Sequence, residues 1–148
     1  MKQLIAICAL AVSFTTYSAC TDDFNQGIAQ YELAMNYFES GSANYQLAVD
    51  ESRGQGRRSI VCDALIKSNT GFDVATNSFS KCIESFTSAT SSCSGQSRDI
   101  ALENKDVCVG NHDVARGNYQ QILSTLKATC FKSEESGVIN LSENIRDL

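Results

Sequence analysis

Residues 61–130 read VCDALIKSNTGFDVATNSFSKCIESFTSATSSCSGQSRDIALENKDVCVGNHDVARGNYQQILSTLKATC. Apolar and small side chains recur in this stretch at alternating steps of three and four, the spacing of one face of an α-helix. A Ser/Thr-rich segment, residues 87–97, interrupts the pattern near its middle. The stretch therefore predicts two long helices joined by a turn, and it carries cysteines in both helices.

The same spacing forms three ladders along the chain. They comprise Phe24, Ile28, Tyr31, Met35, Phe38, Ser42, Tyr45, Val49 and Ser52; Val61, Leu65, Ser68, Phe72, Ala75, Phe79, Cys82 and Phe86; and Ala101, Lys105, Cys108, His112, Ala115, Tyr119, Ile122 and Leu126. The chain contains no proline, the residue that most often breaks a helix. We expect an all-α fold, an elongated antiparallel three-helix bundle running up, down and up, because short connections make neighbouring helices antiparallel.

Helix ends also have signals in the sequence. The segment 21–23, Thr-Asp-Asp, predicts an N-terminal cap for the first helix, and Gly54 follows its last turn. Ser94 or Ser97 is expected to cap the third helix, which ends near Phe131. Four glycines lie inside the helices, each costing about 1 kcal/mol relative to alanine: Gly41, Gly71, Gly110 and Gly117. These helices therefore need tertiary or covalent support.

The N-terminus has the pattern of a secretory signal peptide. Lys2 precedes an apolar run over residues 4–14, and small residues follow near Ala19. We therefore divide the chain into a signal peptide, residues 1–19, a disulfide-bonded bundle, residues 20–132, and a C-terminal tail, residues 133–148. No later segment is apolar enough to cross a membrane.

Six cysteines follow the predicted cleavage point, an even number that favours three disulfides in an oxidising compartment. In an antiparallel hairpin the numbers of facing residues add to a nearly constant value, which pairs Cys82 with Cys108 and Cys62 with Cys130. The remaining pair, Cys20–Cys93, would tie the start of the first helix to the turn. The alternative pairing, Cys82–Cys93 with Cys62–Cys108, shifts the register by several residues.

Cys20 has a second interpretation. A cysteine directly after Ser18-Ala19 resembles the lipid-attachment site of a bacterial lipoprotein, which would place the protein in the periplasm or at the outer membrane. Lipidation would leave five cysteines, an odd number, so free secretion is the preferred localisation.

A resemblance to a known family rests on residues across most of the mature chain. They are Tyr45, Ala48, Arg53, Arg57, the run Phe79-Ser80-Lys81-Cys82, Cys108, Asn111, Tyr119, Leu126 and Cys130. This pattern resembles the insect secreted proteins named after the tsetse midgut EP protein. The resemblance implies an extracellular helical protein and supplies no catalytic residues.

Chemistry-bearing residues are few. His112 follows Cys108 by one helical turn, so the two could bind a metal only if Cys108 were a free thiolate. Arg53, Arg57 and Arg58 form a small basic corner that suits an anion or an acidic partner but is more simply a solvated turn. The net charge of −5 gives no support to nucleic-acid binding. We expect no metal, no cofactor and no catalytic residue.

The aromatic side chains on the ladders could line an apolar cavity, but their place on the ladders favours core packing. They are Tyr31, Phe38, Tyr45, Phe72, Phe79, Phe86 and Tyr119, whereas Tyr37, Asn36 and Asn44 lie beside the ladder. Asn140 begins an Asn-Leu-Ser glycosylation sequon in the tail. The sequence favours a secreted, non-catalytic protein that acts on an unknown protein partner. The alternatives are a carrier of a small hydrophobic ligand, or the lipoprotein anchored through Cys20; the oligomeric state stays open.

Overall fold

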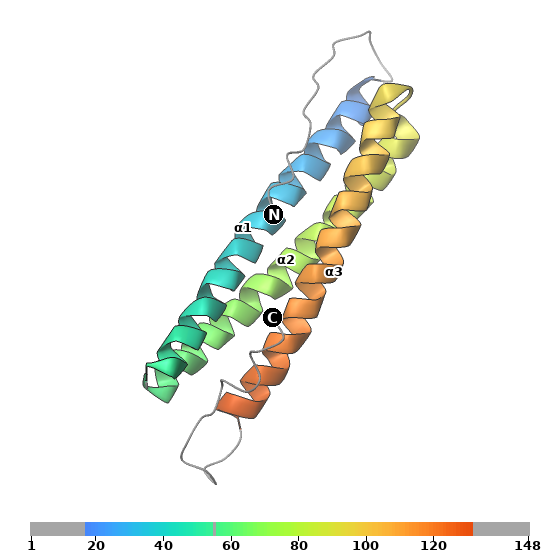
Figure 1. Ribbon diagram of the computed structural model, residues 1–148. Coiled ribbons are helices and arrows are strands. Elements are labelled where there is room, and N and C mark those ends of the chain that lie inside the picture. Colours follow the sequence, from blue (N-terminus) through green and yellow to red (C-terminus); the bar gives the residue numbers. More distant parts are fainter. Residues whose placement is uncertain (1–16, 55, 132–148) are drawn as a thin grey trace.

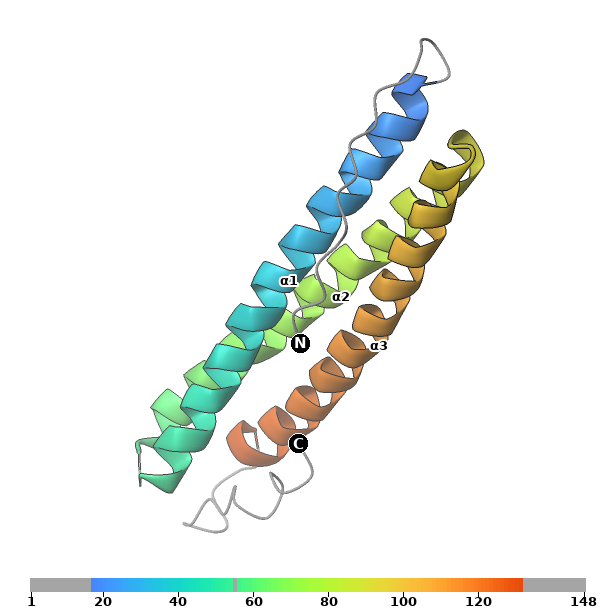
Figure 2. The same cartoon turned by 45° about the horizontal axis from the view of Figure 1, so that its top comes forward.

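The computed structural model describes residues 17–54 and 56–131, and this part of the chain is almost entirely helical. Its three helices are α1 (Tyr17–Arg53), α2 (Arg58–Ser92) and α3 (Gln96–Cys130). They run up, down and up with short turns between them, and α2 lies between α1 and α3 (Figures 1 and 2). The elongated antiparallel three-helix bundle is therefore confirmed.

The helix α1 packs on α2 through a row of small residues. Gly27, Ala34, Gly41 and Ala48 recur every seven residues and are all buried. At the closest point the two backbones meet: a Cβ added to Gly71 of α2 would lie 2.8 Å from the Cα of Gly41. The hydroxyl of Ser68 donates a 2.8 Å hydrogen bond to the carbonyl of Gly41. These two glycines are thus sites of close helix approach.

This row differs from the first apolar ladder of the sequence. Most ladder residues of α1 are only half-buried, and Ser42 is exposed, whereas the ladder on α2 is buried throughout. The reason is steric, since small side chains let α1 approach α2 most closely along the row one step before the ladder. The larger ladder side chains then lie beside this contact and stay half-buried.

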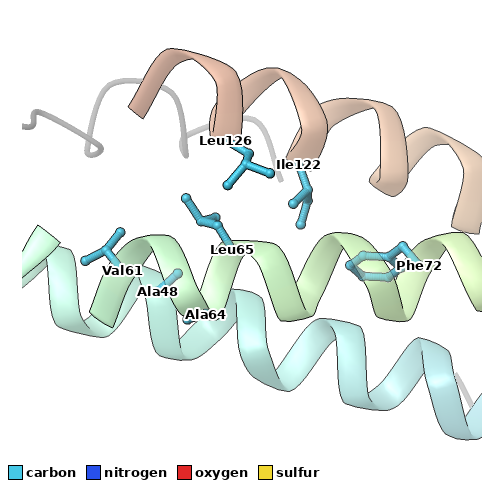
Figure 3. Packing of buried hydrophobic residues seen from close by; sticks show 7 residues of the cluster. All are labelled: Ala48, Val61, Ala64, Leu65, Phe72, Ile122 and Leu126. Carbon is cyan, nitrogen blue, oxygen red and sulfur yellow. The ribbon is translucent and has the colours of Figure 1, made fainter. Parts of the chain in front are cut away.

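The helix α3 packs on α2 through larger side chains. Ile122 and Leu126 of α3 point toward Leu65 of α2, in a cluster that also includes Phe72 and Ala48 (Figure 3). The helices α1 and α3 each pack closely on α2 but barely approach each other. A seam therefore separates α1 from α3.

Three disulfides join the helices. They are Cys20–Cys93, Cys62–Cys130 and Cys82–Cys108, with Cα atoms 4.9, 5.7 and 6.1 Å apart. This is the pairing that the helical register predicts, rather than its alternative. Two of the bonds cross the α2–α3 hairpin at different heights, and the third ties the start of α1 to the turn after α2. The bonds therefore hold both flanking helices to α2.

The helix α1 ends at Arg53 and α3 at Cys130, as predicted, but other helix ends differ from the predicted ones. The helix α1 begins at Tyr17, so segment 21–23 lies inside it, and Asp23 accepts a 2.7 Å hydrogen bond from the Ser92 hydroxyl instead of capping. The helix α2 continues to Ser92 through the Ser/Thr-rich segment, where the Thr87 hydroxyl donates to the Ile83 carbonyl one turn back. The turn that follows is correspondingly short.

The start of α3 is also different from the expected one. Its N-cap is Gly95, with φ +56°, and neither Ser94 nor Ser97 provides a side-chain cap. Instead the Gly95 carbonyl accepts hydrogen bonds from the backbone N–H groups of Arg98 and Asp99. A tight reversal after the disulfide-bonded Cys93 requires this positive φ, which glycine adopts at little cost.

Among the described helices, none contains a segment long and apolar enough to span a bilayer. The signal peptide, apart from its last residues in α1, the tail over residues 133–148 and the Asn140 sequon lie outside the described residues.

Candidate ligand groove between α1 and α3

The seam between α1 and α3 opens into a groove in the half of the bundle that contains the α1–α2 turn. Its volume is about 370 Å³. Ser42, Tyr45, Gln46, Val49 and Arg53 of α1, Phe72 of α2 and Asn118, Gln121 and Ile122 of α3 line it. The groove exists because both flanking helices pack on α2 while α1 and α3 stay apart.

The floor of the groove is apolar. Phe72 and Ile122 are buried members of one core cluster, and Val49 is buried beside them on α1. The Phe72 ring packs edge-on against Phe38 with the ring centroids 5.1 Å apart. This edge contact orients the ring, so the floor offers an apolar surface that an apolar group could contact.

The walls carry neutral hydrogen-bonding groups. Tyr45 is half-buried, and desolvation raises the pKa of its phenol, which therefore stays protonated and able to donate at neutral pH. Asn118 and Gln121 present amides from α3, and Gln46 presents an amide from α1. The Gln46 amide donates to Asp50 at 2.9 Å. The groove thus combines an apolar floor with a polar rim.

One cation stands at one end of the groove. Arg53 lies in the last turn of α1 and is exposed. At the other end, the Phe72 ring lies beside Gly41, twelve residues earlier on α1. At 1.5 Å per residue this separation is about 18 Å. The groove therefore runs from an aromatic end to a cationic end.

The structure does not form the metal site considered at His112. Cys108 is buried in its disulfide with Cys82, so it offers no thiolate. The His112 imidazole lies 3.3 Å from the exposed Asp113 carboxylate. Within residues 17–54 and 56–131, no three metal-ligating side chains come together.

The three arginines of the basic corner occupy different places in the structure. Arg53 lines the groove, whereas Arg57 is the N-cap residue of α2 and Arg58 is its first helical residue. For Phe79 and Phe86 the sequence favoured core packing over a cavity lining, and both are fully buried core residues. Only Tyr45 and Phe72 from the aromatic set line the groove.

Sequence reasoning missed the wall that α3 contributes. Asn104, Asn111 and Asn118 recur every seven residues beside the third apolar ladder, so they share one face of α3. Asn104 is buried, and its amide nitrogen has no hydrogen-bond partner among the described residues. Amides repeated at helical spacing next to an apolar face were the signal that could have indicated a polar seam.

A second surface feature lies on the outer side of α1. Leu33, Tyr37 and Leu47 are 42%, 40% and 46% exposed. Asn36 is exposed, while Asn44 is half-buried and donates a hydrogen bond to the Ser40 carbonyl. Positions 33, 37, 40, 44 and 47 share one helical face and carry no charge.

Comparisons with family models, with curated proteins and with solved structures find no match to this chain, so the resemblance to the tsetse EP family stays a prediction.

Proposed function

We propose that the protein is an exported, non-catalytic binding protein that holds a small amphipathic ligand in the groove between α1 and α3. The observation that carries this proposal is the groove itself, with Phe72 on its floor and Tyr45, Asn118 and Gln121 on its walls. An apolar floor with a few convergent polar groups is the usual composition of a small-molecule site.

The size of the groove sets the size of the ligand. A volume of about 370 Å³ lies in the range of ligand pockets. Since water occupies about 30 Å³ per molecule in the liquid, the groove matches a ligand of roughly a dozen non-hydrogen atoms. For a ligand of this size in an open groove we expect dissociation constants from micromolar to millimolar.

Export is the second part of the proposal. Three disulfides support an oxidising compartment, in which such bonds persist. The lipoprotein alternative requires the Cys20 sulfur for a thioether, and the disulfide with Cys93 uses that sulfur. Free secretion therefore remains the preferred localisation.

A titration followed by NMR tests the ligand site. Decanoate has twelve non-hydrogen atoms, and its addition should shift the side-chain amide signals of Asn118 and Gln121. Ser42→Trp places an indole at the groove and should weaken this binding, while Ser40→Trp, on the outer face of α1, should not. Both serines are exposed, so neither change disturbs the core. Unchanged amide signals would contradict the proposal, as would equal binding by the two variants.

The second candidate function, binding of a protein partner, has its own supporting observation. The uncharged face of α1 around Leu33, Tyr37 and Leu47 has the aromatic and aliphatic character of an interface core. A photo-crosslinking amino acid in place of Tyr37 should crosslink to one partner protein in the fluid into which the protein is secreted. The same residue at the exposed Asp106 of α3 is the control. Equal capture at both positions would count against a specific interface.

A further inference from the structure

The charge distribution of the groove distinguishes between classes of ligand. Among the described residues that line it, Arg53 is the only one with an ionised side chain at neutral pH. The chain as a whole carries a net charge of −5, so the charge of Arg53 is opposite in sign to the net charge of the protein. The groove therefore offers its ligand a positive end within an acidic protein.

The Arg53 guanidinium makes no ion pair with a described carboxylate. The ion pair of Lys67 with Asp63 and the contact of His112 with Asp113 do not involve Arg53. Asp50, three residues earlier on α1, accepts a hydrogen bond from Gln46 and remains a carboxylate. The C-terminus of α1 adds a partial negative charge, so these neighbours weaken the attraction of the guanidinium for an anion without occupying its donors.

The neutral groups of the walls are suited to the same ligand class. The Tyr45 phenol and the amides of Asn118 and Gln121 are neutral donors, so they can donate a hydrogen bond to an oxygen atom of the ligand. The Phe72 ring lies beside Gly41, whose backbone is about 18 Å from that of Arg53 along α1. An elongated ligand with one polar end therefore has a defined orientation.

We propose that the ligand is an amphipathic monocarboxylate whose carboxylate pairs with Arg53 and whose apolar chain lies over Phe72. This inference rests on the proposed function of the groove. A guanidinium presents parallel N–H donors that match the two oxygens of a carboxylate, which a neutral or cationic head group cannot use in the same way.

Matched probes test the charge of the head group. Decanoate and decanamide both have twelve non-hydrogen atoms and differ in charge, and decylammonium reverses the charge. The disulfide-bonded protein is titrated calorimetrically at low ionic strength. The dissociation constant of decanoate should be about fivefold lower than that of decanamide, which is the size of effect expected for an exposed ion pair. Decylammonium should bind more weakly than decanamide, and raising the salt to 0.15 M should weaken decanoate alone.

Two charge-removing variants locate the effect. Arg53→Gln should bind decanoate and decanamide equally, and Arg53→Lys should restore part of the difference. Arg57→Gln removes the same charge from an exposed residue outside the groove and should keep the wild-type difference. Both positions of change are on the surface, so thermal unfolding should confirm a folded protein for each of the three variants.

The outcomes separate this inference from the proposed function. Equal affinity of the wild type for decanoate and decanamide, or a difference that persists in Arg53→Gln, would overturn the carboxylate inference and leave the groove as a ligand site. Failure of all three probes to bind would overturn both.

Discussion

Replacement of Gly71 by alanine tests the close contact between α1 and α2. The added Cβ would lie 2.8 Å from the Cα and 2.9 Å from the nitrogen of Gly41, and 3.0 Å from the carbonyl oxygen of Tyr37. All three atoms belong to the backbone, so no side chain can rotate away. The helices must separate by roughly 0.5–1 Å to restore ordinary contact distances, as expected when a close-packed core is overfilled.

The magnitude follows from opposing contributions. Alanine in a helix is favoured over glycine by about 1 kcal/mol. Overpacking costs about 1–3 kcal/mol, and separation of the helices stretches the Ser68–Gly41 hydrogen bond, worth about 1 kcal/mol. We therefore expect Gly71→Ala to lower the free energy of unfolding by about 2 kcal/mol.

Gly117→Ala is the matched control on α3. Nothing lies within 4 Å of a Cβ at this position, so only the helix propensity changes. This variant should gain about 1 kcal/mol, or roughly 3–5 °C in Tm. Urea unfolding of the disulfide-bonded proteins, followed by circular dichroism, measures both values. A Gly71→Ala variant as stable as Gly117→Ala would refute the argument that the two helix backbones are in contact.

Three further predictions concern the bonds that hold the bundle and a titration at the groove. Removal of the Cys62–Cys130 disulfide by a double serine variant should cost about 4 kcal/mol in urea unfolding, because the bond closes a long loop of sequence separation 68. Ser68→Ala should cost about 1 kcal/mol through the lost hydrogen bond to Gly41, and an unchanged midpoint would show that this bond contributes nothing. Burial raises the pKa of the Tyr45 phenol above 10.0 in the folded state. Above that pH the phenol therefore ionises more readily in the unfolded chain than in the folded protein, and this favours unfolding. Stability should therefore fall as pH rises through and beyond about 10, and less so in Tyr45→Phe; identical alkaline slopes would contradict this assignment.

The helices and the disulfide register were predictable because they depend on local periodicity. The ladder on α2, from Val61 to Phe86, is buried along its whole length, as its spacing indicated. Cys82 and Cys108 fall on facing ladders, so the helical register alone brought them together. Such patterns depend on residues three and four apart, which a sequence displays directly.

The groove could not be predicted in the same way because it depends on distances between helices. Gly27, Ala34, Gly41 and Ala48 bring α1 close to α2, and this row lies outside the first ladder. The resulting separation of α1 from α3 places Asn118 and Gln121 on a wall of the groove. Two glycines also have different surroundings: a neighbouring backbone leaves no room for a side chain at Gly71, whereas nothing lies within 4 Å of a Cβ at Gly117. The sequence alone does not distinguish these two positions.

The arrangement of the disulfides has a consequence for cleavage of the chain. A backbone cut in the turn between α1 and α2 would leave α1 attached, because Cys20 remains bonded to Cys93. A cut between Ser94 and Gly95 would leave α3 attached through Cys62–Cys130 and Cys82–Cys108. Each interhelical turn is thus spanned by at least one covalent bridge. A protease that nicks either turn once produces two chains that stay one molecule until the disulfides are reduced.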